Sequence, residues 1–443
     1  MQEGSLADVV GEPLNAELKE MISSIPDAIL NCISKVNSKG GMWLVGGAVR
    51  EVLLGRHPKD WDFAVDLSPD EMIELFPDAI PTGVAFGTVT LRAGDDLIET
   101  TTLRGEGTYG DGRRPDSVEY SKSLVLDLSR RDFTFNAMAV DVARGLLHDP
   151  FDGQIDLQNR CLRAVGDARL RLGEDGLRVI RAYRFMDLGK GNLCSADLQL
   201  GKSLLDQQHM LRMVAPERIW IELSKILAGY NAGVILHRMA VDGLLNRILP
   251  SEWDENDTAI IAQMSSHLQG ISIEARLALL LTNAAAGGLE KELKKCKLST
   301  SQIRRVLNLR RWVKSLPIEE PEGKLRVYSH LLASDLGEVK RMDLAWADAG
   351  GEGPSLTECI AFHKRLSELS VSRTNGDSLA SGEWIMQHTK LSPGPQLGAL
   401  KNWLHLIQIE RNLGLLDEVE EVLCSLPWQH GDWKQWPNLS QYF

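Results

Sequence analysis

Two aspartates separated by one residue, Asp60 and Asp62, are the residues in this sequence best suited to catalysis. In a strand, side chains two positions apart project from the same face, so both carboxylates would point the same way. Such a pair can hold two divalent cations, of which one lowers the pKa of a hydroxyl nucleophile and the other stabilises a leaving pyrophosphate. Glu99 lies on a later predicted strand and is interpreted equally well as a third ligand or as a solvated edge residue.

A glycine pair with a nearby arginine, Gly46-Gly47-x-x-Arg50, precedes the aspartates. Small residues let a backbone approach a triphosphate closely, and a helix that starts here would present free N–H groups to an anion. A Gly-Gly pair alone also fits a plain strand-to-helix turn. Combined with Asp60 and Asp62, it favours phosphoryl or nucleotidyl transfer.

Arginines in two further segments could contact a phosphate or a base. Arg113 and Arg114 follow a glycine-rich stretch, which predicts an exposed loop that is either solvated or reaches toward a ligand. Arg131 and its neighbour Arg130 are expected near a helix start capped by nearby Ser129 or Asp127. Two cations there conflict with the helix dipole unless an anion compensates them, although a solvated arginine pair is the commoner explanation.

Asp175 and Arg178 are three residues apart, so they would be neighbours on one helix. An intrahelical ion pair is the simpler interpretation. The alternative is base selection, because a carboxylate accepts from an exocyclic amine while a guanidinium donates to adjacent ring acceptors. Cytosine and adenine both offer that combination. Arg181 and Arg184 would extend the basic surface toward phosphates or RNA.

The elements that must position these residues are strands in the first third of the chain and helices afterwards. Residues 14–38 show helical periodicity interrupted by Pro26, with Ser24 as the expected cap of the second helix. Strands are expected at residues 43–45, 62–65, 87–91 and 97–101. After Gly166 the strand signals vanish, which predicts an α+β first part followed by an all-α part that divides near residues 230 and 330.

The composition is that of an ordinary globular protein with a locally basic region. The 443 residues carry a formal net charge of -12, which taken alone argues against nucleic-acid binding, yet residues 160–218 contain nine arginines. The six scattered cysteines form no Cys-x-x-Cys pair, which predicts a reducing, cytoplasmic location. Apolar stretches are too short for a membrane span, and the N-terminus lacks signal-peptide features.

The motifs, in their order, resemble the class II tRNA nucleotidyltransferases, or CCA-adding enzymes, and the related poly(A) polymerases. The resemblance rests on residues 44–50, 60–63, 87–89, 101–104, 113–115, 130–134 and 174–184, and continues through Pro216-Glu217-Arg218 with Glu222 and Lys225. It is strong from about residue 40 to 250 and faint beyond. It implies an N-terminal segment (1–40), a polymerase-β-like nucleotidyltransferase head (41–165), and a helical neck (166–230), body (231–330) and tail (331–443).

The same resemblance implies the activity and its site. Residues matching Asp60 and Asp62 bind Mg²⁺, and residues matching Gly47, Arg50, Arg131, Asp175, Arg178, Arg181 and Arg184 bind the nucleotide. The substrates would be tRNA, CTP and ATP, added without a nucleic-acid template, with the tail in contact with tRNA. Residues matching the segment from Arg104 to Arg114 form the loop that the family needs for the final A, which disfavours a CC-only enzyme.

Three alternatives keep most of these motifs. One is an A-adding tRNA enzyme that works with a separate CC-adding partner, and another is a poly(A) polymerase, which the acidic composition disfavours because broad RNA binding depends on phosphate contacts. A non-catalytic RNA-binding relative is disfavoured by the intact Asp60 and Asp62. The sequence does not give the oligomeric state.

Overall fold

A computed structural model describes residues 7–58, 60–105, 120–249, 255–264, 267–285, 287–314, 316–374 and 376–439. The chain divides into two compact units. Unit 1 consists of Met1–Asp254 together with Lys291–Leu298, and unit 2 of Glu255–Glu290 together with Ser299–Phe443. The finer division into head, neck, body and tail stays a prediction.

Unit 1 is built on one mixed sheet, to which the described residues contribute eight strands in the order β1-β8-β7-β2-β3-β6-β5-β4. Its neighbours are antiparallel except for β3 and β6, which run parallel. All four expected strands are confirmed. The strands are β1 (Glu12–Pro13), β2 (Met42–Val45), β3 (Asp62–Val65), β4 (Ile80–Gly83), β5 (Thr88–Ala93), β6 (Asp96–Thr102), β7 (Ala139–Asp141) and β8 (Leu146–His148).

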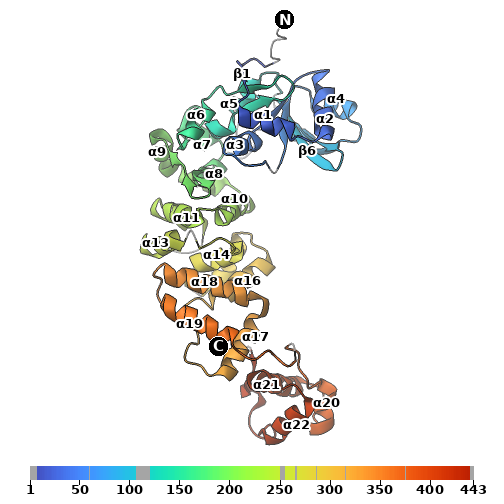
Figure 1. Ribbon diagram of the computed structural model, residues 1–443, viewed down its shortest axis with the longest axis vertical. Coiled ribbons are helices and arrows are strands. Elements are labelled where there is room, and N and C mark those ends of the chain that lie inside the picture. Colours follow the sequence, from blue (N-terminus) through green and yellow to red (C-terminus); the bar gives the residue numbers. More distant parts are fainter. Residues whose placement is uncertain are drawn as a thin grey trace. The chain divides into compact units, whose positions relative to one another are not determined.

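Helices α2 (Asp27–Asn37) and α3 (Gly47–Leu53) pack against the central strand β2, whose four residues are all buried, and α1 (Ala16–Ser23) packs against α3. Figure 1 labels the three helices near the top of the picture. Pro26 separates α1 from α2 as predicted. The prediction that Ser24 caps α2 was wrong. Ser24 ends α1, and α2 starts directly after Pro26, which has no N–H group that would need a partner at this position.

The second half of unit 1 is mainly helical but contains short strands that the sequence analysis did not expect. Gly189 and Gly191 both have positive φ and form the turn of a hairpin between β10 (Asp187–Gly189) and β11 (Asn192–Leu193). The elements here are α5 (Leu124–Ser129), α6 (Gly153–Gln158), β9 (Cys161–Leu162), α7 (Ala168–Glu174), α8 (Leu177–Met186), β12 (Ser195–Ala196), α9 (Leu198–Asp206), α10 (Pro216–Ala228), α11 (Ala232–Val241) and α12 (Leu245–Ile248).

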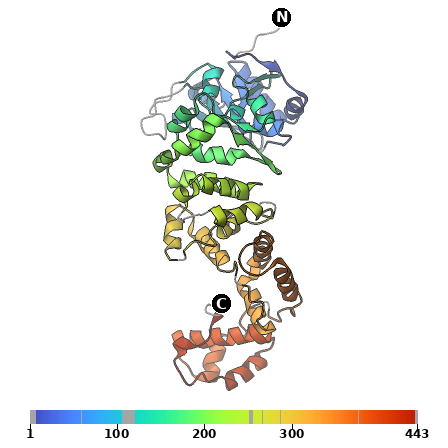
Figure 2. The ribbon, with the colours of Figure 1, turned by 90° about the vertical axis from the view of Figure 1, so that its left-hand side faces the viewer.

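Unit 2 is all-helical over the ranges that the structure describes (Figure 2). Near its end, Trp436 is buried in a cluster with residues of α20, α21 and α22, and Trp428 and Trp433 pack against that cluster. None of the helices in the described part of the chain is long and apolar enough to span a membrane. The helices are α13 (Glu255–Gln263), α14 (Ile273–Leu280), α16 (Thr300–Arg310), α17 (Glu322–Leu332), α18 (Leu336–Asp348), α19 (Leu356–Ser367), α20 (Gly382–Thr389), α21 (Pro395–Arg411) and α22 (Leu416–Ser425); α15 (Leu289–Lys295) begins in unit 2 and ends in unit 1.

Candidate active site

The turn between β2 and α3 is built around Gly46. Its φ of +70° is a conformation that residues with a side chain rarely adopt, so glycine is required here. A Cβ at this position would also lie 3.2 Å from Nη1 of Arg131, which therefore extends over the turn. Helix α3 begins directly after Gly46, and the partial positive charge of a helix N-terminus favours an anion next to this turn.

Asp62 is the first residue of β3, whereas Asp60 precedes the strand, so the two aspartates do not share one strand as the sequence analysis expected. Both still line the same cavity as the glycine turn. Removal of water around the carboxylate raises the pKa of Asp62, the charge of Asp60 raises it further, and Arg131 opposes both effects. Parallel pairing sets Asp62 beside Glu99 of β6, and burial together with the Asp62 charge raises the pKa of Glu99. Burial is the larger cause of both pKa shifts and the neighbouring carboxylates add to it, and a bound cation would offset both effects.

The two aspartates fit a divalent cation by their donor chemistry. Carboxylate oxygens are the ligands that Mg²⁺ prefers, and this ion commonly takes one or two carboxylates together with water and substrate phosphates. Among the described residues, no three His, Cys, Asp or Glu side chains are arranged to hold a metal ion. Glu99 therefore does not complete a three-carboxylate site in this structure, and its role as an accessory ligand stays a prediction.

One cavity of 560 Å³ collects the predicted site residues. All those predicted to bind nucleotide or metal line it, whereas Glu99 does not, and Arg113 and Arg114 lie outside the described residues. The lining consists of Gly46, Gly47, Arg50, Asp60, Asp62, Arg130, Arg131, Asp132, Asn136, Asp175, Leu177, Arg178, Arg181, Arg184, Phe185, Arg218 and Lys225.

The arginine pair Arg130-Arg131 follows a helix instead of starting one. Ser123 caps α5 by accepting a hydrogen bond from the Leu126 N–H, so the expected caps Ser129 and Asp127 were wrong. The pair lies at the C-terminal end, where the helix dipole favours cations, and the predicted conflict does not exist. Asp127 is buried, which would raise its pKa, but both guanidiniums bind it and hold the pKa below its ordinary value.

Buried carboxylates bind two of the three arginines of α8, Arg181 and Arg184. Arg181 Nε donates to Oδ2 of Asp132 over 2.8 Å, and Arg184 Nη1 to Oε2 of Glu222 over 2.6 Å. Burial would raise the pKa of Asp132, but Arg181 and the amide of Asn136 outweigh it and lower the pKa to about 2. Burial and the nearby Arg181 charge lower the pKa of Arg184 to about 10, against the pull of Glu222.

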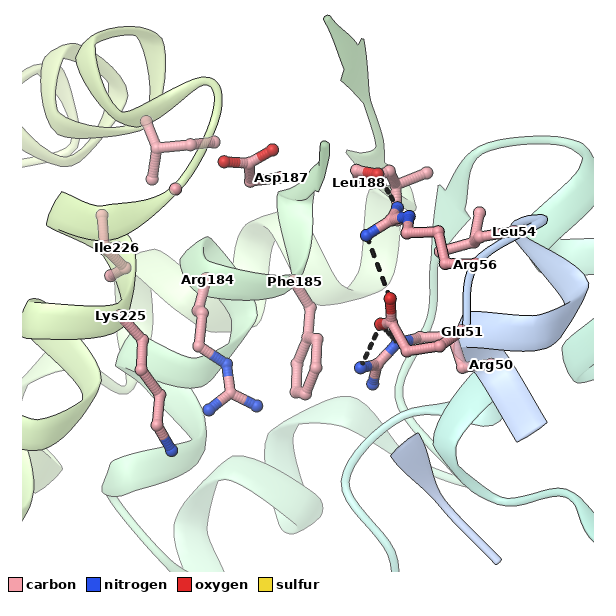
Figure 3. Close-up of a pocket in the computed structure, with 12 residues that line it drawn as sticks. Arg50, Glu51, Leu54, Arg56, Arg184, Phe185, Asp187, Leu188, Lys225 and Ile226 are labelled. Atoms are coloured by element: carbon pink, nitrogen blue, oxygen red, sulfur yellow. Dashed lines mark hydrogen bonds and ion pairs between the residues drawn. The ribbon is translucent and has the colours of Figure 1, made fainter. Parts of the chain in front are cut away.

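The ring of Phe185 lies close to the guanidiniums of three arginines that line the cavity. Phe185 is 7% exposed, and the guanidinium carbons of Arg184, Arg50 and Arg181 lie 4.2, 4.8 and 5.2 Å from its ring centroid. Figure 3 shows the ring between Arg184 and Arg50. The negative face of an aromatic ring stabilises cations at such distances, so Phe185 helps to hold like charges close together without ligand.

Asp175 and Arg178 do not form the predicted intrahelical pair. Asp175 has extended backbone angles between α7 and α8, so the two residues do not share one continuous helix. Its Oδ2 accepts from Arg218 Nη2 of α10 over 2.8 Å. Arg178 instead binds Glu174 and donates to the backbone carbonyls of Arg171 (2.8 Å) and Arg130 (2.9 Å). Both side chains still line the cavity.

Several cavity residues were given no role by the sequence analysis, notably Asn136, Phe185 and Asp132. Arg218, Glu222 and Lys225 were noticed only as part of a motif on α10. The available signal was that motif: the three residues recur at spacings of four and three, which places them on one helical face. Their partners become evident only once α10 is packed in place, because Glu222 binds Arg184 of α8 and Arg218 binds Asp175, which precedes α8.

Two family models match this chain. The Poly A polymerase head domain matches residues 42–163, and the Probable RNA and SrmB- binding site of polymerase A matches residues 200–255. The first covers every strand of the main sheet except β1, together with the glycine turn and both aspartates. The second begins in α9 and ends beyond α12.

Curated relatives and a solved structure agree with these matches. The CCA-adding enzyme of Lactococcus lactis is 32% identical over 365 residues, which are 81% of this chain and 86% of that enzyme. That of Listeria monocytogenes is 44% identical over 190 residues, 43% of this chain and only about half of the enzyme, at 47%. The crystal structure of the Bacillus stearothermophilus CCA-adding enzyme in complex with CTP shares the fold, with a TM-score of 0.74 and 24% identity over 93% of this chain and 99% of that one. This chain therefore belongs to the CCA-adding tRNA nucleotidyltransferases of the poly(A) polymerase family.

Proposed function

We propose that this protein adds CCA to the 3′ end of tRNA, using CTP and ATP and no nucleic-acid template. The observation that carries the proposal is the 560 Å³ cavity, in which the carboxylates of Asp60 and Asp62 and the glycine turn share one space with the arginines of α8. The family membership supports the same reaction, and a relative of the same fold was crystallised with CTP.

In the proposed reaction, the terminal 3′-hydroxyl of tRNA attacks the α-phosphorus of the incoming nucleotide. A P–O bond forms to the tRNA, the bond between the α-phosphorus and the bridging oxygen breaks, and pyrophosphate leaves with the bond electrons while the hydroxyl proton passes to solvent. Asp60 and Asp62 would hold Mg²⁺, which when bound acidifies the hydroxyl and offsets the charge on the leaving group. Gly46, Gly47, Arg50 and Arg131 would bind the triphosphate by backbone N–H groups and guanidiniums.

Base choice would come from Asp175 and Arg178. Asp175 would accept from the exocyclic amine of cytosine or adenine, and Arg178 would donate to the ring acceptor beside it. Guanine and uracil present a carbonyl where the amine is needed, which would face the carboxylate of Asp175 unfavourably. The separate anchors of the two side chains, Arg218 for the first and the backbone of Arg130 for the second, support this division of roles.

An A-adding enzyme is the alternative that the same cavity allows. The decisive experiment supplies purified protein with Mg²⁺ and three tRNA transcripts that lack CCA, end in C, or end in CC, with CTP and ATP given separately and together. We expect growth of all three to a single CCA end. Extension of only the CC-ended transcript by one A would instead make this an A-adding enzyme, and long A tracts would make it a poly(A) polymerase.

A further inference from the structure

Glu51, the residue after the nucleotide-binding Arg50, joins two guanidiniums with one carboxylate. Its Oε1 accepts from Arg50 Nη2 over 2.8 Å and from Arg50 Nε over 3.2 Å, while its Oε2 accepts from Arg56 Nη1 over 3.0 Å. Figure 3 shows Glu51 between these two side chains, with the contacts dashed. The Glu51 side chain is 25% exposed, so the carboxylate is partly shielded from water.

Arg56 carries this connection into another part of unit 1. Its Nη2 donates to the backbone carbonyl of Leu188 in β10. The neighbouring Gly189 has a φ of +78°, and a Cβ there would lie 3.3 Å from Nη1 of Arg56. The glycine at position 189 thus allows both the positive φ of the turn and the close approach of the Arg56 guanidinium. Asp187 fixes the hairpin, because it accepts from the N–H groups of Gly189 (2.8 Å) and Asn231 (2.9 Å).

Arg50 lines a second cavity, of 180 Å³, besides the one that contains the predicted site residues. The walls of this second cavity combine apolar side chains, among them Leu54 and Ile226, with charged ones, among them Arg56 and Asp187. The contact of Arg50 with Asn136 and its position over Phe185 hold only one side of the guanidinium. Glu51 binds the other side, through Nε and Nη2.

We propose that Glu51 is a positioning residue for Arg50, with Arg56 as its anchor on the β10 hairpin. The proposal rests on the proposed function, because it assigns Arg50 to the triphosphate. The Glu51 carboxylate keeps Arg50 directed at the cavity and separates it from Arg56, whose like charge would repel it. A partly exposed ion pair that served stability alone would contribute little and would leave nucleotide affinity unchanged.

The test is Glu51→Gln, which preserves side-chain size and removes the charge. We expect the KM for both CTP and ATP to rise by about tenfold or more, since a misplaced positioning group weakens ligand contacts strongly. The KM for tRNA and the melting temperature should change little. Equilibrium binding of a non-hydrolysable CTP analogue should weaken by a similar factor. The matched control is Glu20→Gln, an exposed carboxylate of α1 that lines another cavity beside Arg56.

A second variant tests the anchoring role of Arg56 apart from the charge of Glu51. Arg56→Met should raise the nucleotide KM in the same direction by a smaller factor, and the double variant with Glu51→Gln should be no worse than Glu51→Gln alone. Unchanged nucleotide KM in both single variants of an active enzyme would overturn the positioning role. Absence of any CTP or ATP incorporation by the unaltered protein would instead refute the proposed function. If Glu51→Gln fails to fold, Arg56→Met and Arg56→Lys decide the question by the same measurements.

Discussion

Asp175 is oriented by Arg218, a residue 43 positions later in the chain, through a contact of 2.8 Å between Oδ2 and Nη2. The carboxylate ends α7, whereas the guanidinium belongs to the first turn of α10. Asp175 also accepts from the Leu177 N–H over 2.9 Å, so it has partners on two sides. A carboxylate held in this way can present a fixed lone pair to a base.

Arg218→Met should therefore reduce base selectivity. Without the guanidinium, Asp175 loses a charge-assisted hydrogen bond of a kind that contributes roughly 1.5–3 kcal/mol, and its orientation becomes less defined. We expect the preference for CTP and ATP over UTP and GTP to fall by about tenfold, measured as kcat/KM ratios on a CC-ended or C-ended tRNA. Arg212→Met, at an exposed arginine of the short 3-10 helix Gln208–Met213 that precedes α10, is the control. Unchanged ratios would show that Asp175 does not depend on Arg218.

Arg178→Ala should relax base choice beyond any loss of rate. Its guanidinium is the donor assigned to the ring acceptor, so its removal lets UTP and GTP compete. Arg178→Lys should also discriminate poorly, because an ammonium lacks the planar set of donors. Misincorporation is measured by sequencing the extended tRNA ends, with Arg169→Ala on α7 as an exposed control. A uniform loss of rate with unchanged selectivity would contradict the base-reading role.

Asp60→Ala and Asp62→Ala should each abolish incorporation and leave tRNA binding mostly intact. Cations held by these carboxylates would contribute several kcal/mol to transition-state stabilisation, so the rate should fall roughly a thousand-fold or more. Single-turnover incorporation and a filter-binding assay with labelled tRNA measure the two effects. Asp95→Ala, in the exposed turn between β5 and β6, should behave as the unaltered protein. Residual activity within tenfold of normal would mean that the metal assignment is wrong.

Gly46→Ala should damage nucleotide binding more than folding alone explains. The φ of +70° costs an alanine roughly 1–2 kcal/mol, and its Cβ would press on Arg131 at 3.2 Å. Gly145→Ala is the matched control: it has a similar φ of +65°, but a Cβ there meets nothing within 4 Å. Both variants should lose similar stability in urea unfolding, whereas only Gly46→Ala should raise the nucleotide KM. Equal nucleotide KM values for the two variants would show that the Gly46 turn does not bind the triphosphate.

Asp132 should make unit 1 sensitive to acid. Its folded pKa of about 2 lies below the ordinary 3.8, so its contribution is complete above about pH 5 and is lost as the pH falls from about 4 to 2. The difference corresponds to roughly 2 kcal/mol. Asp132→Asn should lower the urea midpoint at pH 7, and the gap to the unaltered protein should narrow below pH 4. A constant gap at every pH would show that the Asp132 charge contributes nothing through Arg181.

Local signals account for the parts of the site that could be predicted. The glycine turn, Asp60 and Asp62 lie within 17 consecutive residues, so the short chain between them keeps them close even though only Asp62 belongs to β3. The four main strands were predicted because each has its own apolar or β-branched run. The β10–β11 hairpin was missed since its strands have only three and two residues, too few to show a period.

Long-range packing decides what could not be predicted. Helical spacing suggested Arg178, three residues later, as the partner of Asp175. The helix is broken between α7 and α8, however, and Asp175 binds Arg218 instead. The cap of α5 was misplaced because Ser123, Asp127 and Ser129 are all capable caps, and local sequence does not rank them. The sequence could not show that Glu222 binds Arg184, because this contact forms only when α10 packs against α8.

Unit 1 closes with residues that come late in the chain. Leu293 of α15 is fully buried, Cys296 contacts the Ile248 carbonyl, and Lys297 pairs with Glu217, although residues 255–290 between them belong to unit 2. During synthesis from the N-terminus, the catalytic unit thus cannot reach its final packing until residue 298 has left the ribosome. A nascent chain that stops at residue 254 contains every proposed catalytic group, but it lacks the contacts that Cys296 and Lys297 make with the Ile248 carbonyl and with Glu217.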